Sequence, residues 1–190
     1  MYSIKKDSIY LYEIKKSKFY TLLYKINDEK EIDDYLKKVK DTYKDATHYC
    51  YAYKVNNLKK CSDDGEPSGT AGLPILEVLD KKNIDNILCV VVRYFGGIKL
   101  GAGGLIRAYA NSVKEALDNN EIVELTEGLE IKLETNYENK KDIEYLFKDN
   151  IKDATYDQAI TYILRIKKED LEKLSKYKYE LLNEILIEKE

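Results

Sequence analysis

Residues 93–104, RYFGGIKLGAGG, bring together two cations, two aromatic side chains and five glycines. We refer to them as the glycine segment. An apolar run (87–92) precedes the segment and an apolar stripe at helical spacing (105–117) follows it, which predicts a strand, a glycine loop and a helix. The first N–H groups of a helix lack partners within the helix, and its dipole favours negative charge there. We therefore expect a phosphate or nucleic-acid site formed by the following residues: Arg93, Tyr94, Gly96, Gly97, Lys99, Gly101, Gly103, Gly104 and Arg107.

Two named phosphate-binding motifs do not fit this segment. A P-loop requires Lys and Ser or Thr after G-x-x-x-x-G, whereas Ala102 and Gly103 follow Gly101. The dinucleotide fingerprint requires a third glycine at the position that Ile106 occupies. The expectation of an anion site therefore depends on the chemistry of the segment. The alternative is a tight turn with close helix–strand packing and no ligand.

A second loop has the opposite charge. Residues 61–80 contain five acidic residues and no Lys or Arg, and residues 61–72, here called the acidic loop, are rich in glycine. The carboxylates of Asp63, Asp64 and Glu66 can ligate a hard cation such as Mg²⁺. The hydroxyls of Ser68 and Thr70 can donate to an anion or cap a helix predicted over 73–79. The alternative is a solvated, capped turn without a ligand.

The single histidine, His48, stands at the start of a strand predicted over 47–55. An imidazole titrates near neutral pH, so His48 is a candidate accessory group or base, and a packed structural histidine is the alternative. Cys50, Cys61 and Cys89 form no C-x-x-C pair, which argues for a reducing cytoplasm and against a disulfide framework. A zinc site built from His48, Cys50 and Cys61 would need a fourth ligand, and we assign no metal.

Composition limits the class of protein. The 190 residues are 44% hydrophobic and 35% charged, with a net charge of −3, so any nucleic-acid surface must be local. No apolar run approaches the length of a membrane span, and the first residues, MYSIKKDSIYLYEIKK, lack the apolar core of a secretion signal. We therefore expect a cytoplasmic protein that makes no membrane contact.

Patterning predicts an α+β protein with two domains. Strands are expected over 9–14, 18–26, 47–55 and 87–92, with a helix after residue 28. Residues 122–125 are expected to close the first sheet, and 126–128 to form a linker. The tail then reads strand, helix, strand, strand, helix from residue 169, and strand, which suits a split-βαβ domain. These patterns give a first domain over 1–126 and a small second domain over 127–190.

Four motifs in order resemble the IMPACT/YigZ family: KKSKF (15–19), ATHYCYAY (46–53), SDDGEPSGTAGLPIL (62–76) and VVVRYFGGIKLGAGGLIRAYANSV (90–113). The tail resembles the C-terminal domain of bacterial members in pattern only. The amino-terminal RWD domain of eukaryotic members is missing, so the chain looks like the bacterial form.

The resemblance implies a first domain with the fold of the second domain of ribosomal protein S five. It implies a ferredoxin-like second domain, similar to domain V of elongation factor G. It also implies a role linked to translation or RNA, without an established reaction.

Three functions remain open at this point. The first is binding of RNA or the ribosome, with phosphates on Arg93, Lys99 and Arg107 and a base on Tyr94 or Phe95. The second is inhibition of a protein partner in the translation machinery or the stress response. The third is an enzyme that holds Mg²⁺ on the acidic loop and a phosphorylated substrate on the glycine segment, with His48 or Asp64 as base.

Overall fold

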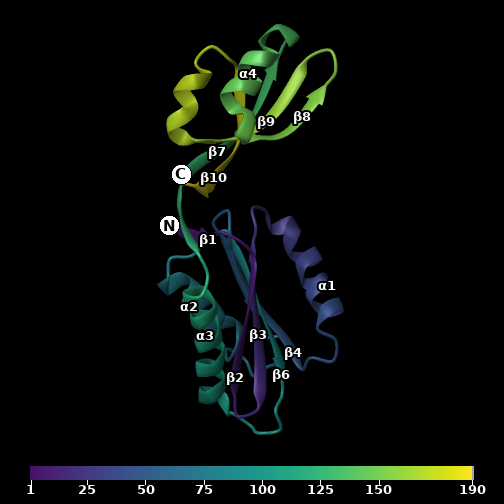
Figure 1. Cartoon of the computed structure of the whole chain (residues 1–190), viewed down its shortest axis with the longest axis vertical. Helices are drawn as coiled ribbons and strands as arrows, with labels where there is room; N and C mark the ends of the chain where they lie inside the picture. The colour runs from purple at the N-terminus through teal and green to yellow at the C-terminus, as the bar shows by residue number, and fades with distance from the viewer. Residues whose placement is uncertain (190) are drawn as a thin grey trace. The chain divides into compact units, whose positions relative to one another are not determined.

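A computed structural model describes residues 1–189 (Figure 1). The chain divides into two compact units, Met1–Glu124 and Leu125–Glu190, each with its own hydrophobic core. The expected α+β class is confirmed, because each unit combines an antiparallel sheet with helices. No helix in the described part of the chain is both long and apolar enough to cross a membrane.

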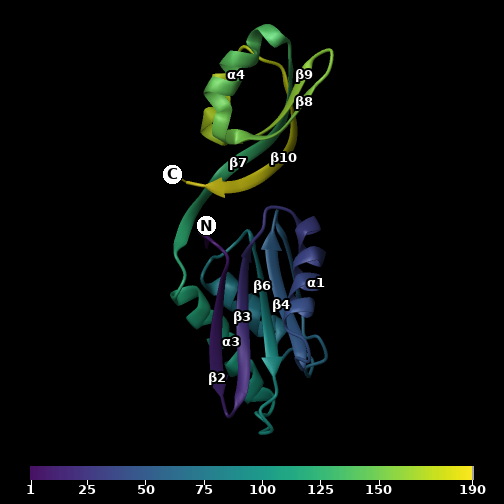
Figure 2. The same ribbon diagram turned by 45° about the vertical axis from the view of Figure 1, so that its right-hand side comes forward.

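The first unit is built on a five-stranded antiparallel sheet in the order β2-β3-β6-β4-β5. Four of its strands match the predicted ranges: β2 (Ser8–Ile14), β3 (Ser17–Lys25), β4 (His48–Val55) and β6 (Ile87–Tyr94). The fifth, β5 (Leu58–Ser62), was not predicted. Figure 2 shows β6 between β3 and β4, so the strand that leads into the glycine segment is central in the sheet.

Helices cover both faces of this sheet (Figures 1 and 2). The helix α1 (Ile32–Thr42) packs on one face, and α2 (Gly72–Lys81) and α3 (Ala102–Asp118) pack on the other. Residues of β6 alternate between the two cores: Leu88, Val90 and Val92 face α1, whereas Cys89 and Val91 face α2 and α3. The continuous apolar run therefore reflects burial on both faces, as predicted.

Three expected boundaries differ from the structure. The segment 122–125 does not join the five-stranded sheet, because the start of β7 (Ile122–Thr135) pairs with β1 (Tyr2–Ile4). The expected linker at 126–128 lies inside β7, which continues without a break. The helix α3 begins at Ala102, two residues before the predicted start near Gly104.

The second unit has the strand order β10-β7-β9-β8, with all neighbours antiparallel. Its strands beyond β7 are β8 (Ile151–Tyr156), β9 (Ile160–Lys167) and β10 (Tyr179–Glu188). The helix α4 (Lys140–Phe147) packs Ile143 and Phe147 on one face of this sheet. This order agrees with the predicted split-βαβ arrangement. The second helix of that arrangement is a 3₁₀ segment, η4 (Lys168–Leu174), instead of the α-helix expected from residue 169.

Candidate functional site

The glycine segment and the acidic loop meet in one pocket of about 330 Å³ at the end of β6. Its walls combine charged, polar and apolar side chains from both loops and from the start of β4. The lining residues are Thr47, His48, Glu66, Pro67, Arg93, Phe95, Lys99, Leu100, Gly101, Ala102 and Leu105. We call this the glycine-loop pocket.

Strand alternation separates the aromatic and basic residues at the end of β6. Arg93 lies on the α3 face, where its guanidinium is 5.5 Å from the ring centre of Phe19 and 5.6 Å from that of Phe95. Tyr94 lies on the α1 face, where its ring meets Tyr20 edge-on. The structure therefore places Phe95 in the pocket and Tyr94 outside it.

A buried ion pair forms the floor of the pocket. Arg93 Nη1 donates a hydrogen bond to Glu66 Oε1 at 2.5 Å, and the hydroxyl of Tyr109 donates to the same oxygen at 2.9 Å. Arg93 is 5% exposed and Glu66 is 8% exposed. Glu66 thus neutralises the charge of Arg93, so Arg93 contributes less to phosphate attraction than the sequence suggested.

The hydrogen-bond network continues from Tyr109 into the core. The thiol of Cys50 lies 2.9 Å from the carbonyl oxygen of Asp63 and 3.3 Å from the Tyr109 hydroxyl oxygen, so its single proton can be donated to either acceptor. Burial raises the pKa of Cys50 to about 12, and burial also raises the pKa of Tyr109 far above its usual value. Both groups therefore keep their protons at neutral pH and act as donors. Cys50 has the environment of a structural thiol, because a nucleophilic thiol needs a lowered pKa.

His48 is oriented by the acidic loop. Its Nδ1 lies 2.8 Å from the carbonyl oxygen of Asp64, and Gly65 packs against the ring. Its Nε2 lies 3.8 Å from Glu66 Oε2, within ion-pair range but beyond hydrogen-bond distance. His48 thus presents Nε2 to the pocket that its side chain lines.

Asp63 organises the acidic loop through its carboxylate. This carboxylate accepts hydrogen bonds from the backbone N–H groups of Gly69, Ala71 and Gly72 at 2.8, 3.0 and 2.8 Å. Burial by itself raises the pKa of Asp63, but the three donors outweigh it, and the net pKa lies below the usual value. Asp63 thereby satisfies the N–H of Gly72, the first residue of α2, and that of Ala71, which precedes it. The expected hydroxyl cap of that helix is wrong: Thr70 is buried and donates to the carbonyl of Pro67.

The other residues of the acidic loop that were predicted as ligands do not converge on one site either. Asp64 Oδ2 accepts from the backbone N–H of Tyr49 at 2.7 Å, and Ser68 is exposed and does not line the pocket. Within residues 1–189, no group of three His, Cys, Asp or Glu side chains is arranged to hold a metal ion. The carboxylates of Asp63, Asp64 and Glu66 point to different donors instead of converging on one cation.

Three glycines of the glycine segment are required by geometry, and one of them, Gly97, has a φ of +82°. A Cβ on Gly96 would lie 2.0 Å from the backbone carbon of Lys16, and Gly101 has a φ of +72°. Gly101 caps α3, and the N–H of Leu105 is the first to bond back to its carbonyl. The N–H groups of the three residues between them, Ala102, Gly103 and Gly104, have no acceptor in the described part of the chain. The start of α3 therefore presents free N–H groups beside the pocket.

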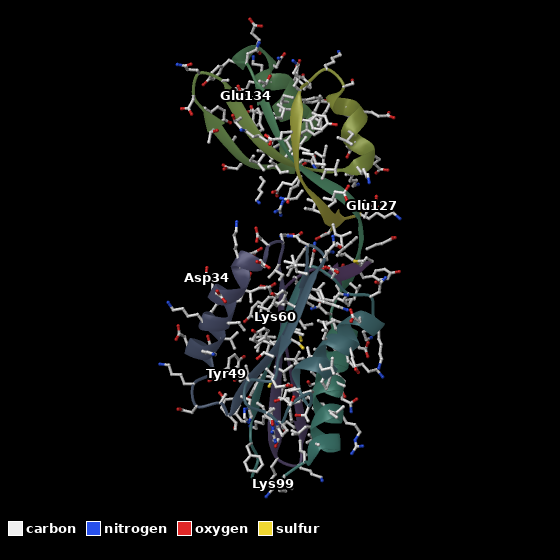
Figure 3. All side chains as sticks on the ribbon, turned by 180° about the vertical axis from the view of Figure 1, so that it is seen from behind. Asp34, Tyr49, Lys60, Lys99, Glu127 and Glu134 are labelled. Carbon is white, nitrogen blue, oxygen red and sulfur yellow. The ribbon has the colours of Figure 1, made fainter. Side chains whose placement is uncertain are left out.

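The remaining predicted residues are exposed around this helix start. Lys99 lines the pocket, and Figure 3 shows it at the loop end of the first unit. Gly97 and Gly103 are exposed, whereas Gly104 is half-buried against Leu100. Arg107 is exposed on α3 and does not line the pocket.

The sequence assigned Tyr109 no polar role and suggested Cys50 only as a possible zinc ligand. Tyr109 belongs to the apolar stripe of α3, so its periodicity indicates only a core position. The alternation of β4 likewise places Cys50 on an inward face. Tyr109 contacts Glu66, 43 positions away, and Cys50 contacts Tyr109, 59 positions away, and no local pattern signals such contacts.

Comparison with known proteins supports the resemblance. A family model described as the Impact N-terminal domain matches residues 15–117. The IMPACT family member YvyE of Bacillus subtilis (strain 168) is 46% identical over 126 residues, which cover 65% of this chain and 58% of YvyE. YigZ of Escherichia coli (strain K12) is 42% identical over 110 residues, which cover 55% of this chain and 54% of YigZ. The chain thus spans little more than half the length of these curated relatives.

A solved structure agrees over the whole chain. A crystal structure of a hypothetical protein is 30% identical, with a TM-score of 0.72, and the match covers 100% of this chain and 98% of that one. The family model covers more than half of the residues, including the pocket-lining positions of both loops. On this evidence, the chain belongs to the IMPACT family.

Proposed function

We propose that this chain is a cytoplasmic, translation-linked regulatory protein that binds RNA, free or in the ribosome, through the glycine segment. The observation that carries the proposal is the start of α3, where three N–H groups without acceptors adjoin Lys99 and the ring of Phe95. Helix N-termini bind phosphate through such N–H groups, and an exposed aromatic ring can stack on a base. The role in translation follows the expectation for the family.

The cations contribute to this proposal in different ways. Lys99 and Arg107 are exposed, and neither forms an ion pair within residues 1–189. They are therefore the side chains expected to contact phosphates directly. Arg93 is paired with Glu66 and supports the ring of Phe95, so its role is to hold the pocket in shape.

Fluorescence anisotropy with a labelled single-stranded RNA tests the proposal at about 50 mM and about 200 mM salt. The variant is Lys99→Glu/Arg107→Glu, and Lys30→Glu/Lys37→Glu is a control with the same charge change at exposed residues on the α1 side. Wild type and control are expected to bind in a salt-dependent manner. The variant should lose affinity, and its slope of log affinity against log salt should fall by about two. Equal binding by all three proteins would contradict the proposal.

A second candidate function has its own observation. Apolar side chains of the glycine segment and of the first turns of α3 are exposed: Phe95 at 46%, Ile98 at 43% and Ile106 at 42%. Exposed apolar side chains that gather in one region are typical of protein-binding surfaces. The alternative is therefore an inhibitor that docks on a protein of the translation machinery. A pull-down with and without nuclease distinguishes the two functions, because a protein contact survives removal of RNA.

A further inference from the structure

The floor of the glycine-loop pocket presents two hydrogen-bond acceptors that have no donor among residues 1–189. Glu66 Oε1 already accepts from Arg93 and Tyr109, so its second oxygen, Oε2, is the one available to a ligand. Oε2 lies 3.8 Å from His48 Nε2, and no hydrogen bond joins the two atoms. Their side chains are only 3% and 19% exposed, and both line the pocket.

The hydrogen-bond partner of His48 Nδ1 determines whether Nε2 of the neutral ring donates or accepts a hydrogen bond. Nδ1 lies 2.8 Å from the carbonyl oxygen of Asp64, and a carbonyl can only accept. The proton of a neutral imidazole is therefore assigned to Nδ1, which leaves Nε2 as an acceptor. Glu66 Oε2 and His48 Nε2 are then two facing acceptors on the pocket wall, and a ligand that covers them must supply donors, because an acceptor that is buried without a donor is costly. A ligand that brings two O–H groups satisfies both.

The other side of the pocket suits an anion and an apolar body. Gly101 and Ala102 bring the start of α3 to the pocket wall, together with Lys99. Phe95, Leu100 and Leu105 supply apolar surface between the helix start and the floor. The volume of about 330 Å³ is at the small end of ligand pockets, which suits a single nucleotide better than a length of strand.

We propose that the glycine-loop pocket binds the 3′-terminal nucleotide of an RNA strand and recognises its free 2′,3′-diol. One hydroxyl donates to Glu66 Oε2 and the other to His48 Nε2. The phosphate of that nucleotide lies at the start of α3 beside Lys99, and its base contacts Phe95. A ribose within the strand offers only its 2′-hydroxyl, and the 3′ end of a DNA strand offers only its 3′-hydroxyl. Each of them leaves one of the two acceptors unpaired. This inference depends on the proposed RNA binding and adds the part of the RNA that is recognised.

Anisotropy with three versions of one 5′-labelled oligouridine tests the inference on the full chain. The first version ends in a free 2′,3′-diol, the second in a 2′,3′-dideoxynucleotide, and the third in a 3′-phosphate. Wild type is expected to bind the free diol about tenfold more tightly than the dideoxy end, because one of the two lost hydrogen bonds is to a charged group. The 3′-phosphate version should also bind more weakly, because it adds negative charge beside Glu66.

Variants assign the preference to named atoms. His48→Ala should reduce the preference for the diol end without abolishing it, because Glu66 Oε2 still accepts one hydroxyl, and it should keep the contribution of Lys99 to affinity. Ser68→Ala is the matched control, because Ser68 is exposed on the same loop and does not line the pocket. Glu66→Gln provides a second test if it folds, and the comparison of strand ends on wild type requires no variant.

Each outcome separates this inference from the proposed function. Equal affinity of wild type for all three ends overturns recognition of the diol and leaves RNA binding intact. A preference that is as large in His48→Ala as in wild type overturns the assignment to this pocket. Failure of wild type to bind any of the three strands overturns both proposals.

Discussion

Glu66 and Arg93 form a buried ion pair that joins the acidic loop to the end of β6, with Oε1 and Nη1 2.5 Å apart and side chains 3% and 6% exposed. The two stretches of opposite charge in the sequence therefore meet in space, although most of their other charged residues do not take part in this contact. The pair also contacts Tyr109 through Glu66 and two phenylalanine rings through Arg93.

Removal of one partner of this pair should destabilise the first unit strongly. Arg93→Met leaves the Glu66 carboxylate buried without its counter-charge, which is expected to cost roughly 3–5 kcal/mol. The double variant Glu66→Gln/Arg93→Met should cost less than the sum of the single variants, because the unpaired charge is gone. Urea unfolding of the four proteins measures this coupling. Additive costs would show that the pair is not a coupled unit.

Asp63 should make the free energy of unfolding of the first unit depend on pH in the acid range. Its folded pKa lies below the usual value, so its contribution is present above about pH 4 and is lost as the pH falls through the folded pKa. Asp63→Asn, which weakens the bonds to Gly69, Ala71 and Gly72, should cost about 2 kcal/mol at neutral pH. The difference between the variant and wild type should narrow toward pH 3. Urea unfolding across this pH range checks the prediction, and a constant difference would contradict it.

The cysteines should differ in reactivity in the native state. Burial raises the pKa of the Cys50 thiol to about 12 and raises that of Cys89 further, whereas Cys61 is only half-buried. Iodoacetamide at pH 8 should therefore label Cys61 first, because the thiolate is the reactive form and access matters. Peptide mass spectrometry after timed labelling measures the order. Early modification of Cys50 would mean that the network with Tyr109 opens readily.

Glycines in the glycine segment should differ in their tolerance to substitution. Gly96→Ala places a methyl group against the backbone of Lys16, so the loop must move and the first unit should be destabilised by more than about 1 kcal/mol. Gly103→Ala is the matched control, because a Cβ there meets nothing within 4 Å and alanine favours a helix. Thermal unfolding compares the two variants. A stable Gly96→Ala protein would contradict the close approach of Lys16.

The sequence predicted the strands that carry strong apolar patterns and missed those that do not. The run of β6 is unambiguous because both of its faces are buried. The sequence of β5, LKKCS, gives no such signal because it is an edge strand with exposed positions. Gly128 resembled a linker residue, yet it lies within β7, where a Cβ would come within 2.9 Å of Ile187. A glycine needed for close packing cannot be distinguished from a glycine in a turn by composition alone.

The candidate site was predictable in its parts but not in its pairings. Glycine, charge and helix signals located both loops, because these are local features. The ion pair of Glu66 with Arg93 spans 27 positions, and the bond from Tyr109 to Glu66 spans 43. Such contacts depend on the order of the strands, which one sequence does not provide. Alternation along β6 is a local feature, and it predicts that Tyr94 and Arg93 lie on opposite faces of the sheet. The prediction from the sequence did not use it and placed both residues in one site.

The most direct test of RNA binding at the glycine segment is an NMR titration of the ¹⁵N-labelled full chain with single-stranded RNA. If phosphate binds at the start of α3, the amide signals of Ala102, Gly103 and Gly104 should shift progressively and saturate, while those of α1 should stay in place. The same titration of Lys99→Glu/Arg107→Glu should give smaller shifts at equal RNA concentration. Unchanged signals at residues 102–104, with RNA bound elsewhere on the chain, would contradict the account.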